Sequence, residues 1–372
     1  MSIIFTRGLA FGDGFCNRLV EMQQLRTNIK NGAHTLIVSP RRYGKTSLAL
    51  QVLEKEGLPY THIDLFMKYT QQDIENEIYE GVSQLLTKII KPTEKAIQLL
   101  QTFLKQIKIS LSFGEAGFEF SLTPITEKKP SLKFLLEGID QLLIKKNKRA
   151  VIFIDELQTI SESNFGPEVE SSLRFIAQKT KNIIFIFSGS NRHMLREMFD
   201  NRARPFYKLC FKMPIQKIAA AHYIPHLNKF AKKKWGKNLP DPVLLIITNL
   251  TDCHPYYINV LCEKVFEESL FPTEKSILAA WKQVCIEEQG SISRDLELLS
   301  TKQKQLLSEI AKDPALKEPT SKDFVNRVNL TPKGVLDALA ILYKHDLIEK
   351  SVDDFISIID PVLSYWARGL IR

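Results

Sequence analysis

The chain has 372 residues, of which 44% are hydrophobic and 25% are charged, and its net charge is +9. This composition is typical of a soluble globular protein, and the length predicts two or three domains. No stretch is long and apolar enough to span a membrane, and the first residues show no secretion signal. Five scattered cysteines form no C-x-x-C pair and indicate reduced thiols. We therefore expect a cytoplasmic protein with no membrane contact.

Clusters of positive charge lie at residues 145–149 and 229–237. Basic clusters can bind nucleic acid, but most are simply solvated surfaces. The charge therefore leaves a nucleic-acid partner open.

The first predicted elements surround a loop rich in breakers and charge. Residues 15–25 have apolar side chains at helical spacing, and we expect that helix to end near Asn31-Gly32. A short apolar run then ends at Val38, and a segment that favours helix begins at Ser47. This strand–loop–helix order is the context that a phosphate-binding loop requires.

In such a loop, backbone N–H groups hold the phosphates, the lysine reaches the β- and γ-phosphates, and the following hydroxyl binds Mg²⁺. Gly44-Lys45-Thr46 fits these roles, although Ser39 occupies the place of the usual first glycine. The alternative is an ordinary turn with a surface lysine. The residues expected to contact the nucleotide are Ser39, Pro40, Arg41, Arg42, Tyr43, Gly44, Lys45, Thr46 and Ser47.

A second strand is predicted at residues 60–66, with Asp64 near its end as a turn carboxylate that could also lie near the nucleotide. A helix is predicted at 73–90 and another at 131–144. Between them, side chains alternate on both sides of Gly114-Glu115-Ala116-Gly117, which predicts an inserted β-hairpin at about 106–123.

The second chemical motif is Asp155-Glu156, which follows the continuous apolar run 150–154. Such a run is typical of a strand buried on both faces in a parallel sheet. In nucleotide hydrolases the first carboxylate acts on the Mg²⁺ side and the second polarises the attacking water. We assign these roles to Asp155 and Glu156. The alternative is an acidic cap on a core strand.

A third buried strand at 182–187 leads into polar residues. Ser188 or Ser190 is placed to sense the γ-phosphate, although a simple turn would also explain Ser190. Arg192 is a candidate for stabilising charge during phosphoryl transfer.

The remaining chain predicts a last strand at 208–213, then helices broken by prolines, then a winged-helix pattern. Its helices are expected at 303–312, 321–328 and 332–345, and its wing at 347–359. The fold class is therefore α/β, a P-loop NTPase parallel sheet domain with an inserted hairpin. The expected boundaries are 1–213 for this domain, 214–298 for a helical lid and 299–372 for the winged helix.

Taken as a whole, the sequence resembles the archaeal-type P-loop ATPases related to the STAND and AAA-like groups. The residues that carry the resemblance are Asn17-Arg18 with Glu21 and Leu25, Pro40-Arg41-Arg42 with Gly44-Lys45-Thr46-Ser47-Leu48, Asp64, Ile154-Asp155-Glu156 with Gln158, Gly189-Ser190, Pro205-Phe206-Tyr207, His254-Pro255-Tyr256-Tyr257, and Asp360-Pro361 with Trp366.

The resemblance implies ATP at the loop, Mg²⁺ near Thr46 and Asp155, and adenine near Pro255. Three departures stand out: Ser39, Cys253 before His-Pro, and Lys208-Leu209 in place of a Gly-Arg pair. If that arginine acts in phosphate sensing or subunit contacts, its absence puts rapid turnover or ring-like assembly in question. Arg204 or Arg192 could replace it.

Three functional hypotheses follow. The first is an ATPase whose Mg²⁺-dependent hydrolysis drives a rearrangement of lid and winged helix. The second is a nucleotide-gated switch or scaffold with little turnover. The third is a regulator that binds DNA through the winged helix. Residues 291–372 contain twelve basic and twelve acidic residues, and this balance favours an unknown protein partner over DNA for that domain.

Overall fold

The computed structural model describes residues 5–90, 109–113, 120–124, 132–162, 166–351 and 353–369. The chain divides into two compact units. The sheet unit contains residues 18–41 and 45–215, and the helical unit contains residues 1–17, 42–44 and 216–372. Within the described ranges, no helix combines the length and apolarity needed to cross a membrane. The division into three domains stays a prediction.

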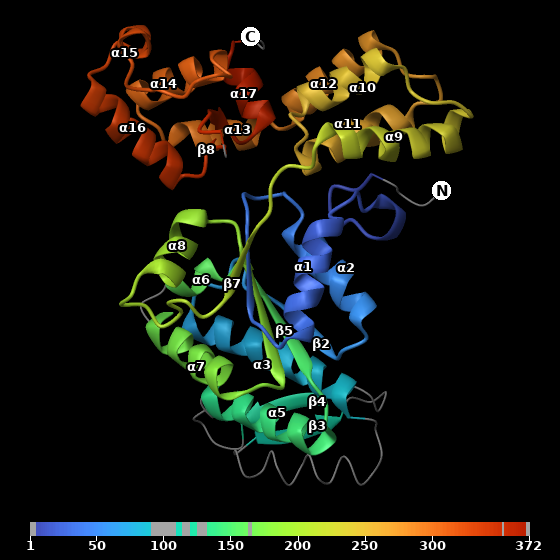
Figure 1. Cartoon of the computed structure of the whole chain (residues 1–372), viewed down its shortest axis with the longest axis vertical. Helices are drawn as coiled ribbons and strands as arrows, with labels where there is room; N and C mark the ends of the chain where they lie inside the picture. Colours follow the sequence, from blue (N-terminus) through green and yellow to red (C-terminus); the bar gives the residue numbers. More distant parts are fainter. Residues whose placement is uncertain are drawn as a thin grey trace. The chain divides into compact units, whose positions relative to one another are not determined.

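The sheet unit is built on five parallel strands in the order β2-β5-β6-β1-β7 (Figure 1). The strands are β1 (Thr35–Val38), β2 (Tyr60–Asp64), β5 (Ala150–Asp155), β6 (Ile183–Gly189) and β7 (Phe211–Pro214). Every residue of β5 and β6 is buried, as the apolar runs predicted. The predicted parallel α/β sheet is therefore confirmed.

Strand register brings the polar ends of the strands to one edge of the sheet. Val38 lies opposite Gly189, and Asp64 lies opposite Asp155. The loops that follow β1, β5 and β6 therefore begin at the same edge, where open α/β sheets place their ligands.

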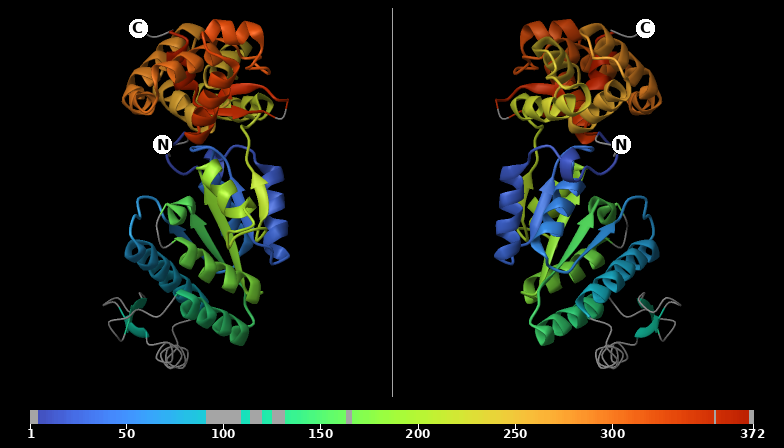
Figure 2. Two further views of the ribbon diagram at one scale, coloured as in Figure 1. Left: turned by 90° about the vertical axis from the view of Figure 1, so that its left-hand side faces the viewer. Right: turned by 90° about the vertical axis from the view of Figure 1, so that its right-hand side faces the viewer.

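Helices cover both faces of the sheet (Figures 1 and 2). They are α1 (Leu19–Lys30), α2 (Lys45–Glu56), α3 (Gln71–Ile89), α5 (Leu132–Lys146), α6 (Gln158–Ser161), α7 (Gly166–Lys179) and α8 (Arg192–Asp200). The apolar faces of α3, α5 and α7 share one core with buried strand residues such as Ile152 and Phe185. Helices α1 and α2 lie on the other face of the sheet.

The predicted hairpin is also present. Strands β3 (Ile109–Phe113) and β4 (Phe120–Pro124) pair in antiparallel fashion, with Leu111 opposite Leu122. Two parts of the predicted hairpin lie outside the described residues: 106–108, before β3, and 114–119, in the turn.

Two element boundaries differ from the prediction for backbone reasons. The first helix begins at Leu19 rather than near Phe15, because Asn17 and Arg18 have φ angles of 53° and 70°. The last strand begins at Phe211 rather than Lys208, whose φ is 54°. A left-handed backbone conformation fits neither a helix nor a strand.

The helical unit has its own hydrophobic core, which includes the fully buried Trp281. Its first helices are α9 (Ala220–Trp235), α10 (Asp241–Leu250), α11 (Pro255–Glu267), α12 (Glu274–Glu287) and α13 (Gln289–Glu297). They are preceded by the short 3-10 helix η1 (Gly12–Gly14).

The predicted winged-helix segment follows α13 and is confirmed. It consists of α14 (Thr301–Lys312), α15 (Lys322–Val328), α16 (Pro332–Lys344), β8 (Ile348–Lys350), β9 (Ile356–Ile358) and α17 (Pro361–Ala367). Asp360 caps α17 by accepting hydrogen bonds from the backbone N–H groups of Val362 and Leu363.

Candidate nucleotide site

The loop between β1 and α2 has the backbone that a phosphate-binding loop requires. Gly44 has a φ of 86°, and Arg42 has a φ of 64°. Ser39 lies outside this left-handed region, so its Cβ causes no backbone strain at the position of the usual glycine. Lys45, Thr46 and Ser47 form the first turn of α2, whose free N–H groups favour anions.

Two polar side chains of the loop, Ser39 and Lys45, are buried. Ser39 is 1% exposed, and its hydroxyl donates to the carbonyl of Pro40 at 3.1 Å. Lys45 is 5% exposed, and its Nζ donates to the carbonyls of Ser39 at 3.3 Å and Pro40 at 3.1 Å. The ammonium group therefore lies over the loop, held by neutral acceptors.

Thr46 and Asp155 lie side by side, with the threonine hydroxyl donating to Asp155 Oδ2 at 2.5 Å. The Ser188 hydroxyl donates to the other carboxylate oxygen. Burial disfavours the charged form of Asp155, but hydrogen bonds, the adjacent His62 and the charge of Lys45 outweigh it and lower the pKa of Asp155 to about 2. Asp155 is therefore ionised at neutral pH.

A hydroxyl and an ionised carboxylate are hard oxygen donors of the kind that Mg²⁺ prefers. Among the described residues, no group of three or more His, Cys, Asp and Glu side chains could hold a metal. Mg²⁺ commonly binds one or two carboxylates together with substrate phosphates and water.

Glu156 follows Asp155 in a left-handed conformation, with a φ of 52°. Its Oε2 accepts hydrogen bonds from the Ser190 hydroxyl at 2.8 Å and from the Gln158 amide. Arg41 of the phosphate-binding loop donates from Nε to Ser190 Oγ at 3.4 Å. The structure therefore brings together Arg41, Glu156 and Ser190, which were predicted site residues. Gln158, which had no predicted role, joins them.

His62 is a site residue that the sequence analysis missed. Its ring stacks on Phe153 with the centroids 4.7 Å apart, and its Nε2 lies 3.8 Å from Asp155 Oδ2. The alternation along β2 was the available signal, since it places His62 two residues before Asp64. Asp64 itself is exposed and accepts from the backbone N–H of Phe66 at 2.9 Å, as expected for a turn carboxylate.

The two candidate arginines have different surroundings. Arg192 is the first residue of α8 and directly follows Asn191, which caps this helix. Arg204 is ion-paired with the fully buried Glu170 and donates to Ser161 Oγ at 2.7 Å. Arg204 therefore has a structural role in the sheet unit, and the role of Arg192 at a phosphate stays a prediction.

Arg42, Tyr43 and Pro255 belong to the helical unit. The Arg42 guanidinium lies 4.0 Å from the centre of the Tyr256 ring, and its Nη1 lies 3.4 Å from Glu288 Oε2. Tyr43 is buried, and Pro255 is the first residue of α11. Nucleotide contacts by these three residues stay predictions.

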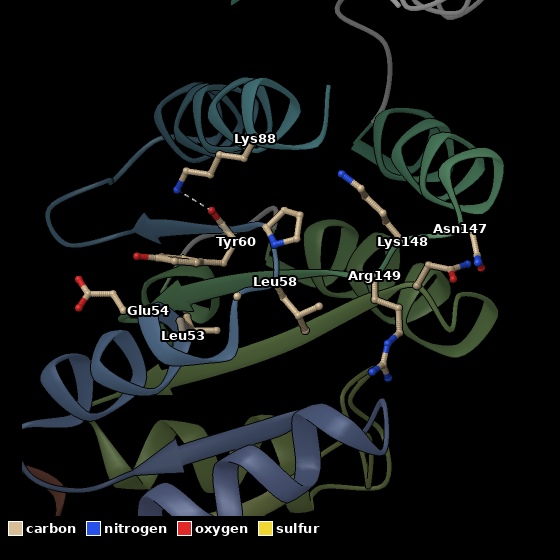
Figure 3. Close-up of a pocket in the computed structure, with 11 residues that line it drawn as sticks. Leu53, Glu54, Leu58, Tyr60, Lys88, Asn147, Lys148 and Arg149 are labelled. Carbon is tan, nitrogen blue, oxygen red and sulfur yellow. Dashed lines mark hydrogen bonds between the residues drawn. The ribbon is translucent and has the colours of Figure 1, made fainter. Parts of the chain in front are cut away.

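The opposite edge of the sheet carries a hollow, drawn in Figure 3, that includes part of the first basic cluster. Lys88 donates there to the carbonyl of Tyr60 at 2.8 Å. Arg149 donates to the carbonyl of Lys30 at 3.0 Å, at the end of α1. Two of its cations therefore bind backbone carbonyls, and the hollow lies at the other ends of the strands from Lys45 and Asp155.

Comparisons with known proteins identify the two parts of the chain. Residues 293–369 match a family described as "Probable winged helix domain", and a search of curated proteins found no match. The Walker-type ATPase PABY2304 of Pyrococcus abyssi is 20% identical, with a TM-score of 0.69 and coverage of 98% of this chain and 99% of that one.

The ORC2 protein of Aeropyrum pernix, solved as ADPNP–ADP complexes, is 15% identical, with a TM-score of 0.59 and coverage of 99% and 96%. These likenesses show a shared fold. Residues 15–261, more than half of the chain, match the family described as "ATPase domain predominantly from Archaea". The protein therefore belongs to this family of ATPases, with a winged-helix domain at its C-terminal end.

Proposed function

We propose that the protein hydrolyses ATP in a Mg²⁺-dependent reaction at the edge of the sheet formed by the loops after β1, β5 and β6. The observation that carries the proposal is the juxtaposition of Lys45, Thr46, Asp155 and Glu156 at that edge. Phosphoryl transfer needs positioned phosphates, charge neutralisation and an oriented water, and these residues match the three requirements.

Each side chain has a distinct role in this proposal. Lys45 exchanges the carbonyls of Ser39 and Pro40 for phosphate oxygens, which form stronger hydrogen bonds with its ammonium group than neutral acceptors do. Thr46 and the ionised Asp155 hold Mg²⁺, which supplies neutralisation of phosphate charge when bound. Glu156 orients the attacking water and accepts its proton.

We further propose that the ATP cycle is coupled to a rearrangement of the helical unit, including its winged helix. The support is that the chain folds as two compact units, one with the proposed nucleotide site and the other with the winged helix. A nucleotide that binds one conformation of such a protein more tightly than another shifts it toward that conformation.

The test is ATP turnover by the full chain with Mg²⁺, for wild type, Lys45→Ala and Glu156→Gln, with Lys55→Ala as a matched control. Lys55 is exposed in the last turn of the same helix. We expect Lys45→Ala to lose ATP binding and Glu156→Gln to bind ATP without turnover, while the control behaves as wild type. Wild-type turnover in Glu156→Gln would overturn its role as the base.

A nucleotide-gated switch is the second candidate, favoured by one observation. The family commonly has a Gly-Arg pair that this chain lacks, and Arg192 and Arg204 are the candidates to replace its arginine. Because Arg204 is paired with Glu170, it is not available for that role. Single-turnover hydrolysis separates the two functions, because a switch binds ATP tightly but converts almost none of it. The DNA-binding alternative is tested by retention of the full chain on duplex DNA at low salt.

A further inference from the structure

Gln158 lies at this edge of the sheet and has no role in the proposed mechanism. It begins the short helix α6, is 5% exposed, and donates from its amide nitrogen to Glu156 Oε2. The nearby backbone is fixed, since the N–H of Leu157 donates to the carbonyl of Ser188 at 2.9 Å.

The second donor to Glu156 has a defined direction. The Ser190 hydroxyl has one proton, and Arg41 can only donate. Because Arg41 Nε points its hydrogen at Ser190 Oγ, the serine proton goes to Glu156 Oε2 at 2.8 Å. Both donors therefore bind the same oxygen, and Oε1 of Glu156 accepts no hydrogen bond from any residue that the structure describes. One carboxylate oxygen is held while the other is left for water.

Gln158 holds this position at a cost. Its Oε1 is buried and has no hydrogen-bond partner among the described residues. An unpaired buried carbonyl is unfavourable, and an apolar side chain of the same size would avoid it. Turning the amide over would place its oxygen against the Glu156 carboxylate, so the bond to Glu156 fixes the unfavourable orientation.

Gly189 makes room for this glutamine. A Cβ built at Gly189 would overlap Gln158 Oε1 and lie 3.3 Å from Gln158 Cδ and 3.1 Å from Leu195 Cδ1. The absence of a side chain at the end of β6 thus lets Gln158 reach Glu156.

From these observations we infer that Gln158 is a positioning residue, which clamps Oε2 of Glu156 so that Oε1 faces the attacking water. The inference rests on the proposed role of Glu156 as general base. Ser190 supplies the second half of the clamp and connects it, through Arg41, to the phosphate-binding loop.

The test compares Gln158→Leu with wild type in the full chain. Leucine removes the donor at similar volume and also removes the unpaired carbonyl. We expect kcat to fall about tenfold to a hundredfold, the range for loss of one hydrogen bond to a charged group. KM and ATP affinity should stay within about twofold, and the thermal midpoint should not fall. Gln141→Leu, an exposed glutamine on α5, is the matched control.

A double-mutant cycle separates positioning from a merely structural role. If Gln158 acts through Glu156, adding Gln158→Leu to Glu156→Gln lowers the residual single-turnover rate no further. The inference would be overturned if the losses of single-turnover rate in the two variants multiplied in the double mutant. A parallel loss of ATP affinity and stability in Gln158→Leu would also overturn it.

The same measurements separate the inference from the proposed function. Full turnover in Glu156→Gln would overturn both. An inactive Glu156→Gln beside a fully active Gln158→Leu would overturn the positioning role alone.

Discussion

Replacing Asp155 by asparagine tests whether the buried carboxylate stabilises the sheet unit or only serves the reaction. The lowering of its pKa from 3.8 to about 2 corresponds to about 2 kcal/mol in favour of the folded state at neutral pH. The Asp155→Asn variant would keep the side-chain size but lose this contribution. One of the two donors to the carboxylate, the hydroxyls of Thr46 and Ser188, would also face an amide NH₂.

The sign of the pH dependence follows from the lowered pKa. The contribution is complete above pH 3.8 and is lost as the pH falls toward 2. The free-energy difference between wild type and Asp155→Asn should therefore be constant, at about 2 kcal/mol, from about pH 5 to pH 8.

Hydrogen exchange of the β5 and β6 amides, read by mass spectrometry, measures this difference within the sheet unit and does not require two-state unfolding of the whole chain. Equal or greater protection in Asp155→Asn would refute the reasoning, because it would mean that the cost of burying the charge exceeds the gain from its partners. In that case the carboxylate would be kept for function at the expense of stability.

Three further predictions concern side chains around the sites. Thr46→Val removes one oxygen donor and should raise the Mg²⁺ concentration for half-maximal turnover about tenfold, by analogy with the loss of a metal-site partner; an unchanged Mg²⁺ titration would exclude Thr46 as a ligand. Gly189→Ala should lower kcat in wild type by displacing Gln158 but have little further effect in Gln158→Ala, where the Cβ meets only the end of the Leu195 side chain, at 3.1 Å; equal losses in both backgrounds would contradict this. Asp360→Ala should destabilise the helical unit by about 2–4 kcal/mol, because it removes a helix cap and leaves the buried Tyr257 hydroxyl unpaired. Tyr257→Phe should cost less, and denaturant unfolding followed by exchange in α17 would rank the two variants.

Pairing across the sheet explains how side chains from separate strands come to surround the acidic pair. Ser188 and Ser190 lie at the end of β6 and just beyond it, and His62 lies on β2, on the two sides of β5. Parallel register carries these side chains to Asp155 and Glu156. Hydroxyl and imidazole groups from separate segments thus surround one acidic pair.

The candidate chemistry could be predicted from the sequence because it depends on contiguous residues. Gly44-Lys45-Thr46 after an apolar run predicts a phosphate-binding turn from local backbone rules. Asp155-Glu156 after a buried strand predicts the acidic pair in the same way. The winged helix followed from helical periodicity and capping residues, which are also local.

The contacts that hold these residues could not be predicted from the sequence, because they form between separate parts of the fold. Ser190 shares one oxygen of Glu156 with Gln158, and Arg204 is paired with Glu170. Both arrangements join segments that are far apart in the sequence. The spacing of residues 41, 156 and 190 along the chain says nothing of their distance in space. Strand order and register bring them together, and these are set by packing of the whole sheet.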